Sequence, residues 1–136
     1  MKSELQDNIE SIIEIKLNSK NYVKGIIPSG ERVLTLFDSG ATKSLISLST
    51  VKSSKYLSSL EHVKVNPVEF KLGNGNTLLA DKVIKFSLKI QAHNFKIVAY
   101  ITPQLTGVDI ILGTNTLGEL NGVLDFKTNT FHIRPQ

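Results

Sequence analysis

The chain has 136 residues, which predicts one domain over residues 1–136 with a hydrophobic core, and residues 1–8 as a flexible extension. It carries a net charge of +4 and no cysteine, so a disulfide framework, thiolate catalysis and cysteine-based zinc sites are excluded. The N-terminus lacks the apolar core of a signal peptide, and no apolar run approaches the roughly 20 residues of a transmembrane helix, so we expect a soluble, unsecreted protein.

The N-terminal part of the chain predicts three β-strands. These strands are Ile9 to Leu17, Tyr22 to Ile27 and Arg32 to Phe37, and the turn residues Pro28-Ser29-Gly30 separate the last two. The third strand runs directly into Asp38-Ser39-Gly40-Ala41, which presents a carboxylate on a tight turn at the end of a buried strand. Asp-Ser-Gly alone is also ordinary turn chemistry, so its meaning depends on the segments downstream.

Helix signals after this turn are few. A short helix is predicted to begin near Ser44 and to carry Leu45 and Leu48. The serine- and lysine-rich stretch Ser49 to Ser59 is predicted to be a solvated connector.

The segment Phe70 to Leu78 predicts a hairpin. Asn74-Gly75 between apolar runs favours a type I′ turn, and Gly73 and Asn76 flank it. A mobile hairpin of this kind can cover an active site as a flap. A plain surface hairpin is the alternative.

An apolar residue at every second position predicts a second hairpin, formed by Ile84 to Ile90 and Phe95 to Ile101 around an Ala92-His93-Asn94 turn. The intervening lysines, Lys82, Lys85, Lys89 and Lys96, are expected on a solvated sheet face. Arginine occurs only at Arg32 and Arg134, and aromatic residues are few, which argues against a nucleic-acid groove.

The three histidines, His62, His93 and His132, follow no metal-ligand spacing, and we expect neither a metal nor another cofactor. The chain then continues with an apolar strand from Val108 to Gly113 and a short helix near Leu117 and Leu120. Thr116 and Glu119 form a possible capping box for that helix. Gly122 to Phe126 and Phe131 to Ile133 predict a closing hairpin.

Four of these features, in this order, resemble the retropepsin family over nearly the whole chain. They are Asp38-Ser39-Gly40-Ala41-Thr42, the glycine-rich hairpin, Ile111-Leu112-Gly113 with Asn115, and the closing hairpin. The motifs are most similar to those of long-terminal-repeat retrotransposons and plant pararetroviruses. The resemblance implies an all-β, retropepsin-like acid protease fold: a closed, barrel-like monomer with one or two short helices that is active as a homodimer.

The resemblance also implies a role for each matching residue. Asp38 is expected to be the catalytic carboxylate, Ser39 to join a hydroxyl network between two loops, and Gly40 to contact the substrate backbone. The other implied site residues are Ala41 and Thr42 in the catalytic loop, Gly73, Asn74, Gly75 and Asn76 at the flap tip, and Ile111, Leu112, Gly113 and Asn115 in the loop-supporting strand and helix.

The chain contains a single Asp-Ser-Gly motif, whereas paired-carboxylate proteolysis needs two aspartates. The second Asp38 must therefore come from another copy of the chain. Two facing carboxylates share one proton, so one acts as base toward water while the other acts as acid, without a covalent intermediate. We expect an aspartic endopeptidase that processes a viral or retroelement polyprotein in the host cytoplasm or in a virus-like particle.

One departure from the retroviral pattern concerns the dimer. Many retroviral enzymes carry an Asp after the motif's Ala and an Arg after the later Gly, and these two residues pair, whereas this chain has Thr42 and Thr114. Because both charged partners are absent, neither leaves an unpaired buried charge, so we expect the fold to be unaffected, but the strength of the dimer is in question.

Two alternatives to an aspartic endopeptidase are open. One is a retropepsin-fold dimerisation or peptide-binding module with little proteolysis, and the other is a small β-barrel that binds nucleic acid.

Overall fold

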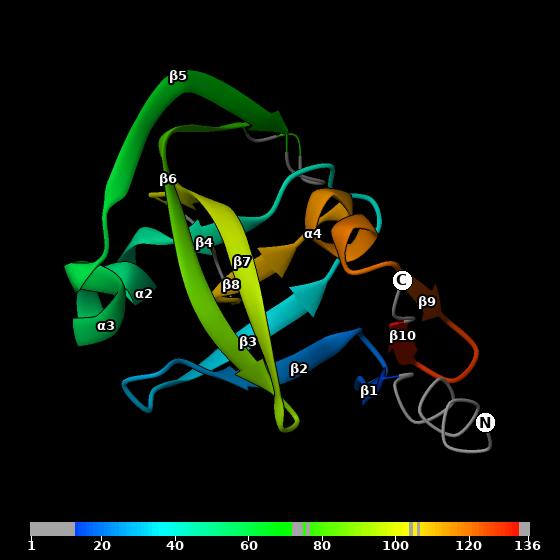
Figure 1. The fold of residues 1–136 in the computed structure, drawn as a ribbon. Helices are drawn as coiled ribbons and strands as arrows, with labels where there is room; N and C mark the ends of the chain where they lie inside the picture. Colours follow the sequence, from blue (N-terminus) through cyan, green and yellow to red (C-terminus); the bar gives the residue numbers. More distant parts are fainter. Residues whose placement is uncertain (1–12, 72–74, 76, 104, 106, 134–136) are drawn as a thin grey trace, which may run out of the picture.

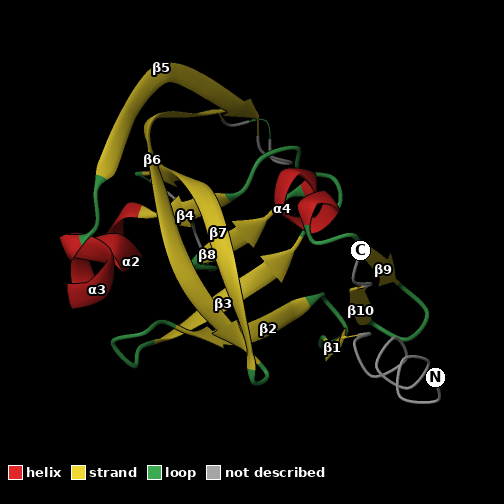
Figure 2. Ribbon diagram, viewed as in Figure 1, coloured by secondary structure: helices red, strands yellow, loops and turns green. Residues whose placement is uncertain are grey.

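A computed structural model describes residues 13–71, 75, 77–103, 105 and 107–133, and these form a mostly β structure with a few short helices (Figures 1 and 2). In chain order the elements are β1 (Ile13–Lys16), β2 (Tyr22–Ile26), β3 (Arg32–Phe37), β4 (Leu45–Ser47), α2 (Leu48–Ser53), α3 (Lys55–Ser59), β5 (His62–Lys71), β6 (Thr77–Ile90), β7 (His93–Thr102), β8 (Ile110–Leu112), α4 (Thr114–Glu119), β9 (Gly122–Asp125) and β10 (Thr130–Ile133). The predicted all-β architecture with short helices is confirmed.

Seven strands form the larger sheet, in the order β2-β3-β8-β4-β7-β6-β5. A further pairing of Ile26 with Lys89 joins β2 to β6 and curls the sheet toward a barrel. Strand β8 runs parallel to β3, and β4 runs parallel to β7. The alternating residues of β6 and β7 place one row inside the barrel, as predicted, with the lysines of these strands exposed outside it.

A second, three-stranded sheet has the order β1-β10-β9 and joins the two ends of the described chain. The predicted closing hairpin is its β9–β10 pair, in which Phe131 lies opposite Leu124. Phe131 is buried, and its ring packs edge-on against that of Phe37 at a centroid distance of 5.0 Å. The small sheet is thereby tied to the end of β3.

Two predictions for residues 44–59 are wrong. The short helix predicted to begin near Ser44 begins instead at Leu48, because Leu45 lies in β4 and pairs with Ile111 of β8 and Tyr100 of β7. The segment 49–59 is not a solvated connector, since it contains most of α2 and all of α3. Val51 and Leu57 of these helices are buried in the core. The burial of these two side chains stabilises the helices, whereas the many serines and lysines of the segment are typical of an exposed connector.

Three boundaries also differ from the predictions. The β6–β7 turn is the two-residue Gln91-Ala92, with φ of 49° and 74°, so His93 already belongs to β7. Helix α4 begins at Thr114 after an N-cap at Gly113, so Thr116 does not form a capping box with Glu119. Strand β2 ends at Ile26. The predicted extension 1–8 and the first residues of the predicted strand from Ile9 lie outside the described residues.

We expect Phe131→Ala to lower the free energy of unfolding by about 3–5 kcal/mol, because it removes a buried aromatic ring between the two sheets. Phe126 is 62% exposed, so Phe126→Ala in the same hairpin is the matched control and should change stability little. Urea unfolding of both variants measures the difference. Equal losses would show that the ring of Phe131 does not join the sheets.

Candidate active site

Asp38 follows β3 directly, and backbone hydrogen bonds fix its position. Its N–H donates to the carbonyl oxygen of Leu112 at 3.0 Å, which extends the parallel β3–β8 pairing by one residue. The carboxylate Oδ1 accepts the N–H of Gly40 at 2.9 Å, and the Asp38 carbonyl accepts the N–H of Ala41 at 3.2 Å. The tight turn predicted from the sequence therefore holds the carboxylate at a defined place.

The buried hydroxyl of Ser44 holds the far end of this loop. It accepts the N–H of Gly113 at 3.0 Å, lies 3.0 Å from Oδ1 of Asn115 and lies 2.5 Å from Oγ1 of Thr116. A hydroxyl donates one hydrogen bond and accepts two, so donation to Asn115 leaves Thr116 as a donor to Ser44. The sequence prediction missed Ser44 as a site residue, because a lone serine before an apolar run carries no distinctive signal.

The loop and the start of α4 are in direct backbone contact. The N–H of Thr114 donates to the carbonyl of Ala41 at 2.8 Å, and the N–H of Asn115 donates to that of Thr42 at 3.3 Å. A Cβ on Gly113 would lie 2.5 Å from the Lys43 carbonyl oxygen, too close for any side chain. Only glycine allows the loop to approach here.

A second carboxylate, Asp109, lies directly before β8 and was not predicted as a site residue. Its Oδ2 accepts the N–H of Leu34 and its Oδ1 accepts the hydroxyl of Thr50, both at 2.8 Å. Asp109 thus joins β8 to β3 and to α2 with both oxygens engaged. For Asp38, by contrast, the side-chain hydrogen bonds within the described part of the chain involve Oδ1 alone.

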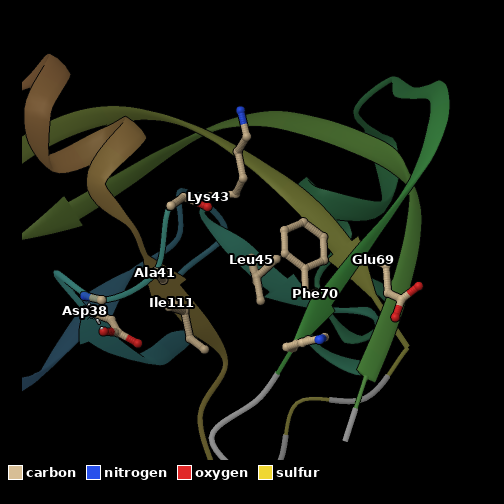
Figure 3. A pocket seen from close by; sticks show the side chains of 10 residues that line it. Asp38, Ala41, Lys43, Leu45, Glu69, Phe70 and Ile111 are labelled. Carbon is tan, nitrogen blue, oxygen red and sulfur yellow. Dashed lines mark hydrogen bonds between the residues drawn. The ribbon is translucent and has the colours of Figure 1, made fainter. Parts of the chain in front are cut away.

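A pocket of about 410 Å³ opens in front of Asp38 (Figure 3). The loop that begins at Asp38, together with β4, β8 and β5, contributes its lining residues, which are Asp38, Gly40, Ala41, Thr42, Lys43, Leu45, Glu69, Phe70, Lys71 and Ile111. The ring of Phe70 in β5 packs edge-on against that of Tyr100 in β7 at a centroid distance of 5.3 Å, which connects these two strands of the larger sheet. Polar and apolar groups therefore meet in one open cavity.

The predicted flap is the hairpin of β5 and β6, whose last pair is Lys71 with Thr77. Gly75 has φ of 86°, the left-handed conformation that the Asn-Gly turn predicts. Gly73, Asn74 and Asn76 lie outside the described residues. The arm of the hairpin borders the pocket through Phe70 and Lys71.

A retroviral aspartyl protease family model matches residues 10–136. The chain belongs to the retroviral aspartyl protease family. Two solved structures are similar to this chain in fold. The retroviral protease-like domain of Ddi1 from Leishmania major is 19% identical, with a TM-score of 0.63, covering 84% of this chain and 87% of that one. The EIAV protease complexed with the inhibitor HBY-793 is 16% identical, with a TM-score of 0.61, covering 80% and 95%. No curated protein sequence matches significantly.

The structure of this family member brings together most of the predicted site residues. Asp38, Gly40, Ala41, Thr42 and Ile111 line one pocket. Leu112, Gly113 and Asn115 lie behind the loop and hold it through the hydrogen bonds above, whereas Ser39 is exposed and outside the pocket lining. Thr42 and Thr114 are both exposed. Within the described residues, no group of three histidine or acidic side chains is arranged to hold a metal, and no helix is long and apolar enough to span a membrane.

We expect Gly113→Ala to destabilise the fold by about 1–3 kcal/mol, because its methyl group meets the carbonyls of Lys43 and Ala41. Gly118→Ala in α4 is the matched control. Nothing lies within 4 Å of its added Cβ, and alanine there favours the helix by about 1 kcal/mol. The midpoint temperature of thermal unfolding should therefore fall for Gly113→Ala and rise for Gly118→Ala. Stabilisation by Gly113→Ala would contradict the described contact between loop and helix.

Proposed function

We propose that the chain is an aspartic endopeptidase whose reacting group is Asp38. The observation that carries this proposal is the setting of that carboxylate. Asp38 is half-buried and lines an open pocket. Backbone hydrogen bonds fix the position of Asp38, and the arm of the β5–β6 hairpin borders the same pocket. Membership of the retroviral aspartyl protease family supports the same chemistry.

The proposed reaction needs two carboxylates that face each other, and one chain supplies one. Glu69 is the other acidic residue in the pocket lining, but it lies on the opposite side of the pocket from Asp38 (Figure 3). We therefore place Asp38 of the partner subunit beside Asp38 across a two-fold axis. Family membership is consistent with a homodimer.

In this dimer the two carboxylates share one proton, because two like charges at close range do not both form readily. The ionised carboxylate takes a proton from a water molecule, and the water oxygen attacks the scissile carbonyl carbon. The protonated carboxylate donates to the carbonyl oxygen as negative charge develops there. Proton transfer to the amide nitrogen then lets the C–N bond break and releases two peptides.

The proposed substrate is an extended peptide segment of a retroelement or pararetroviral polyprotein, cleaved in the host cytoplasm or in a virus-like particle. The apolar side chains of Leu45, Phe70 and Ile111 line the pocket and suit an apolar substrate side chain beside the dyad. The hairpin arm offers backbone groups to an extended peptide.

A second candidate is a peptide-binding or dimerisation module with little proteolytic activity. Its supporting observation is that the exposed Thr42 and Thr114 offer no ion pair to strengthen a dimer. The fold is also shared with the retroviral protease-like domain of Ddi1. Peptide cleavage at high protein concentration separates the two candidates.

We expect Asp38→Asn to reduce cleavage of a peptide library by roughly a thousandfold or more, because the carboxylate carries the proton transfers. The variant should keep its fold, since Asp38 interacts with the rest of the described chain mainly through its backbone and one side-chain oxygen. Asp81→Asn, which removes a carboxylate outside the pocket, is the control and should remain active. Activity retained in a pure Asp38→Asn preparation would contradict the proposal.

A further inference from the structure

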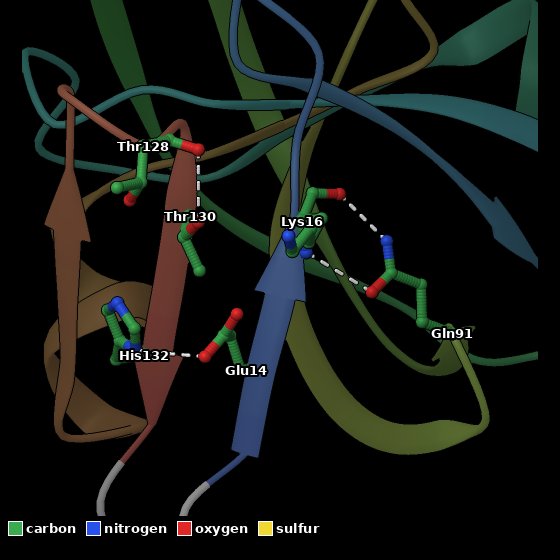
Figure 4. Close-up of polar contacts among 6 residues, drawn as sticks. All are labelled: Glu14, Lys16, Gln91, Thr128, Thr130 and His132. Atoms are coloured by element: carbon green, nitrogen blue, oxygen red, sulfur yellow. Dashed lines mark hydrogen bonds and ion pairs between the residues drawn. The ribbon is translucent and has the colours of Figure 1, made fainter.

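Among the described residues, part of β6 has no strand beside one of its two edges. Strand β5 begins opposite Ile84 of β6, and β2 pairs with β6 at Lys89, so the interval between these two residues has neither neighbour. In this interval the N–H of Ser87 donates to the hydroxyl oxygen of Tyr56 in α3 at 2.9 Å. The side-chain amide of Gln91 closes the edge of β1 in a similar way (Figure 4). Helix α3 therefore takes the place of a strand beside β6.

A groove of about 430 Å³ lies beside this contact, between α3 and the outer face of the sheet. Its apolar walls come from Tyr56 and Leu60 on the helix side and from Val63 and Val83 on the sheet side. Val63 and Val83 are opposed residues of β5 and β6, and Val63 is 47% exposed. No described residue lines both this groove and the Asp38 pocket. The groove is therefore a separate cavity, and its volume is typical of small-ligand sites.

Hydrogen-bond donors with spare capacity meet at the groove. The Nζ of Lys96 donates to Oγ of Ser87 at 3.0 Å, which places a positive charge next to the contact between Ser87 and Tyr56. The Tyr56 hydroxyl accepts from Ser87, and within the described residues its own proton is donated to no acceptor. Lys85 also lines the groove, and neither lysine forms an ion pair in the described part of the chain. Such donors suit an anionic group.

The charges of the groove lining favour a ligand with a single negative charge. The lining contains two lysines and one glutamate, Glu61, so two positive charges and one negative charge leave a net charge of +1. A carboxylate matches this charge, whereas the dianionic form of a phosphate would exceed it. Because Glu61 repels an anion, the ligand should carry its charge at the end that lies beside Lys96.

We propose that the groove binds the carboxylate end of an apolar group. The carboxylate accepts from the ammonium of Lys96 and from the hydroxyl of Tyr56, while the apolar part of the ligand packs against Val63 and Val83. Two kinds of ligand have this chemistry, namely a peptide whose last residue is apolar and a fatty acid. The inference does not depend on the proposed protease activity, because the groove and the Asp38 pocket are separate cavities.

Titration of the isotopically labelled full chain, followed by the backbone amide signals in NMR, tests the site. The first probe is the tripeptide acetyl-Ala-Val-Leu with a free carboxylate, and its matched control is the same tripeptide with a C-terminal amide. The acid should shift the signals of Ser87 and Val63 in a saturable way, and the amide should bind about tenfold more weakly. Dodecanoate, titrated separately, shows whether a fatty acid binds better than a peptide end.

Three variants test the roles of the charges. Lys96→Gln removes the charge but keeps a hydrogen-bond donor, so it should weaken binding of the acid about fivefold. Glu61→Gln removes a repelling charge and should strengthen binding. Lys24→Gln, which removes an exposed lysine of β2 outside the groove, is the matched control and should bind as the wild type does. The amide spectrum of each variant also shows whether it is folded.

Several results would overturn the site. They are equal affinity for the acid and the amide, wild-type affinity in Lys96→Gln, no saturable shift with either the tripeptide or dodecanoate, and shifts centred on Ala41 and Ile111 of the Asp38 pocket. Binding of one probe alone supports the site and identifies the source of the carboxylate. Because the titration needs no cleavage, a failure of the protease assignment would leave its result unchanged.

Discussion

The parallel pairing of β3 with β8 is the constraint on which the site depends. It places the end of one strand, Phe37, beside the end of the other, Leu112, so the turns that follow both strands meet. Asp38 then donates to Leu112, while Gly113 lies under the carbonyls of Ala41 and Lys43. Most of the loop's remaining hydrogen bonds follow from this approach, since it brings the start of α4 within reach of the loop. A small change in the spacing of β3 and β8 would move the carboxylate directly.

The two aspartates beside these strands have different surroundings. Asp109 has both oxygens engaged, by a backbone N–H and by a hydroxyl, which suits a group that holds elements together. Asp38 has one oxygen engaged by its own turn and faces an open pocket. A carboxylate that retains hydrogen-bonding capacity toward a cavity is available to bind water or substrate. The same type of side chain thus occupies a structural position at Asp109 and a candidate reactive position at Asp38.

Local patterns in the sequence predicted much of the fold. Alternation predicted β6 and β7, whereas the contact of Leu112 and Gly113 with the Asp38 loop was implied by the resemblance to the retropepsin family. The errors arose where distant residues decide the structure. Leu45 is a strand residue because β7 and β8 lie on either side of it, and residues 49–59 are helical because Val51 and Leu57 find core partners. Ser44 and Asp109 act through partners more than 58 residues away, which no local pattern reveals.

The central claim is that each active site is shared between two chains. Mixing wild-type protein with Asp38→Asn protein at constant total concentration, after subunit exchange, tests it most directly. If every site needs one Asp38 from each chain, mixed dimers are inactive and activity follows the square of the wild-type fraction. An equal mixture then retains about one quarter of the wild-type activity. Activity that falls in proportion to the wild-type fraction, to about one half in the equal mixture, would show that one chain contains a complete site and would contradict the account.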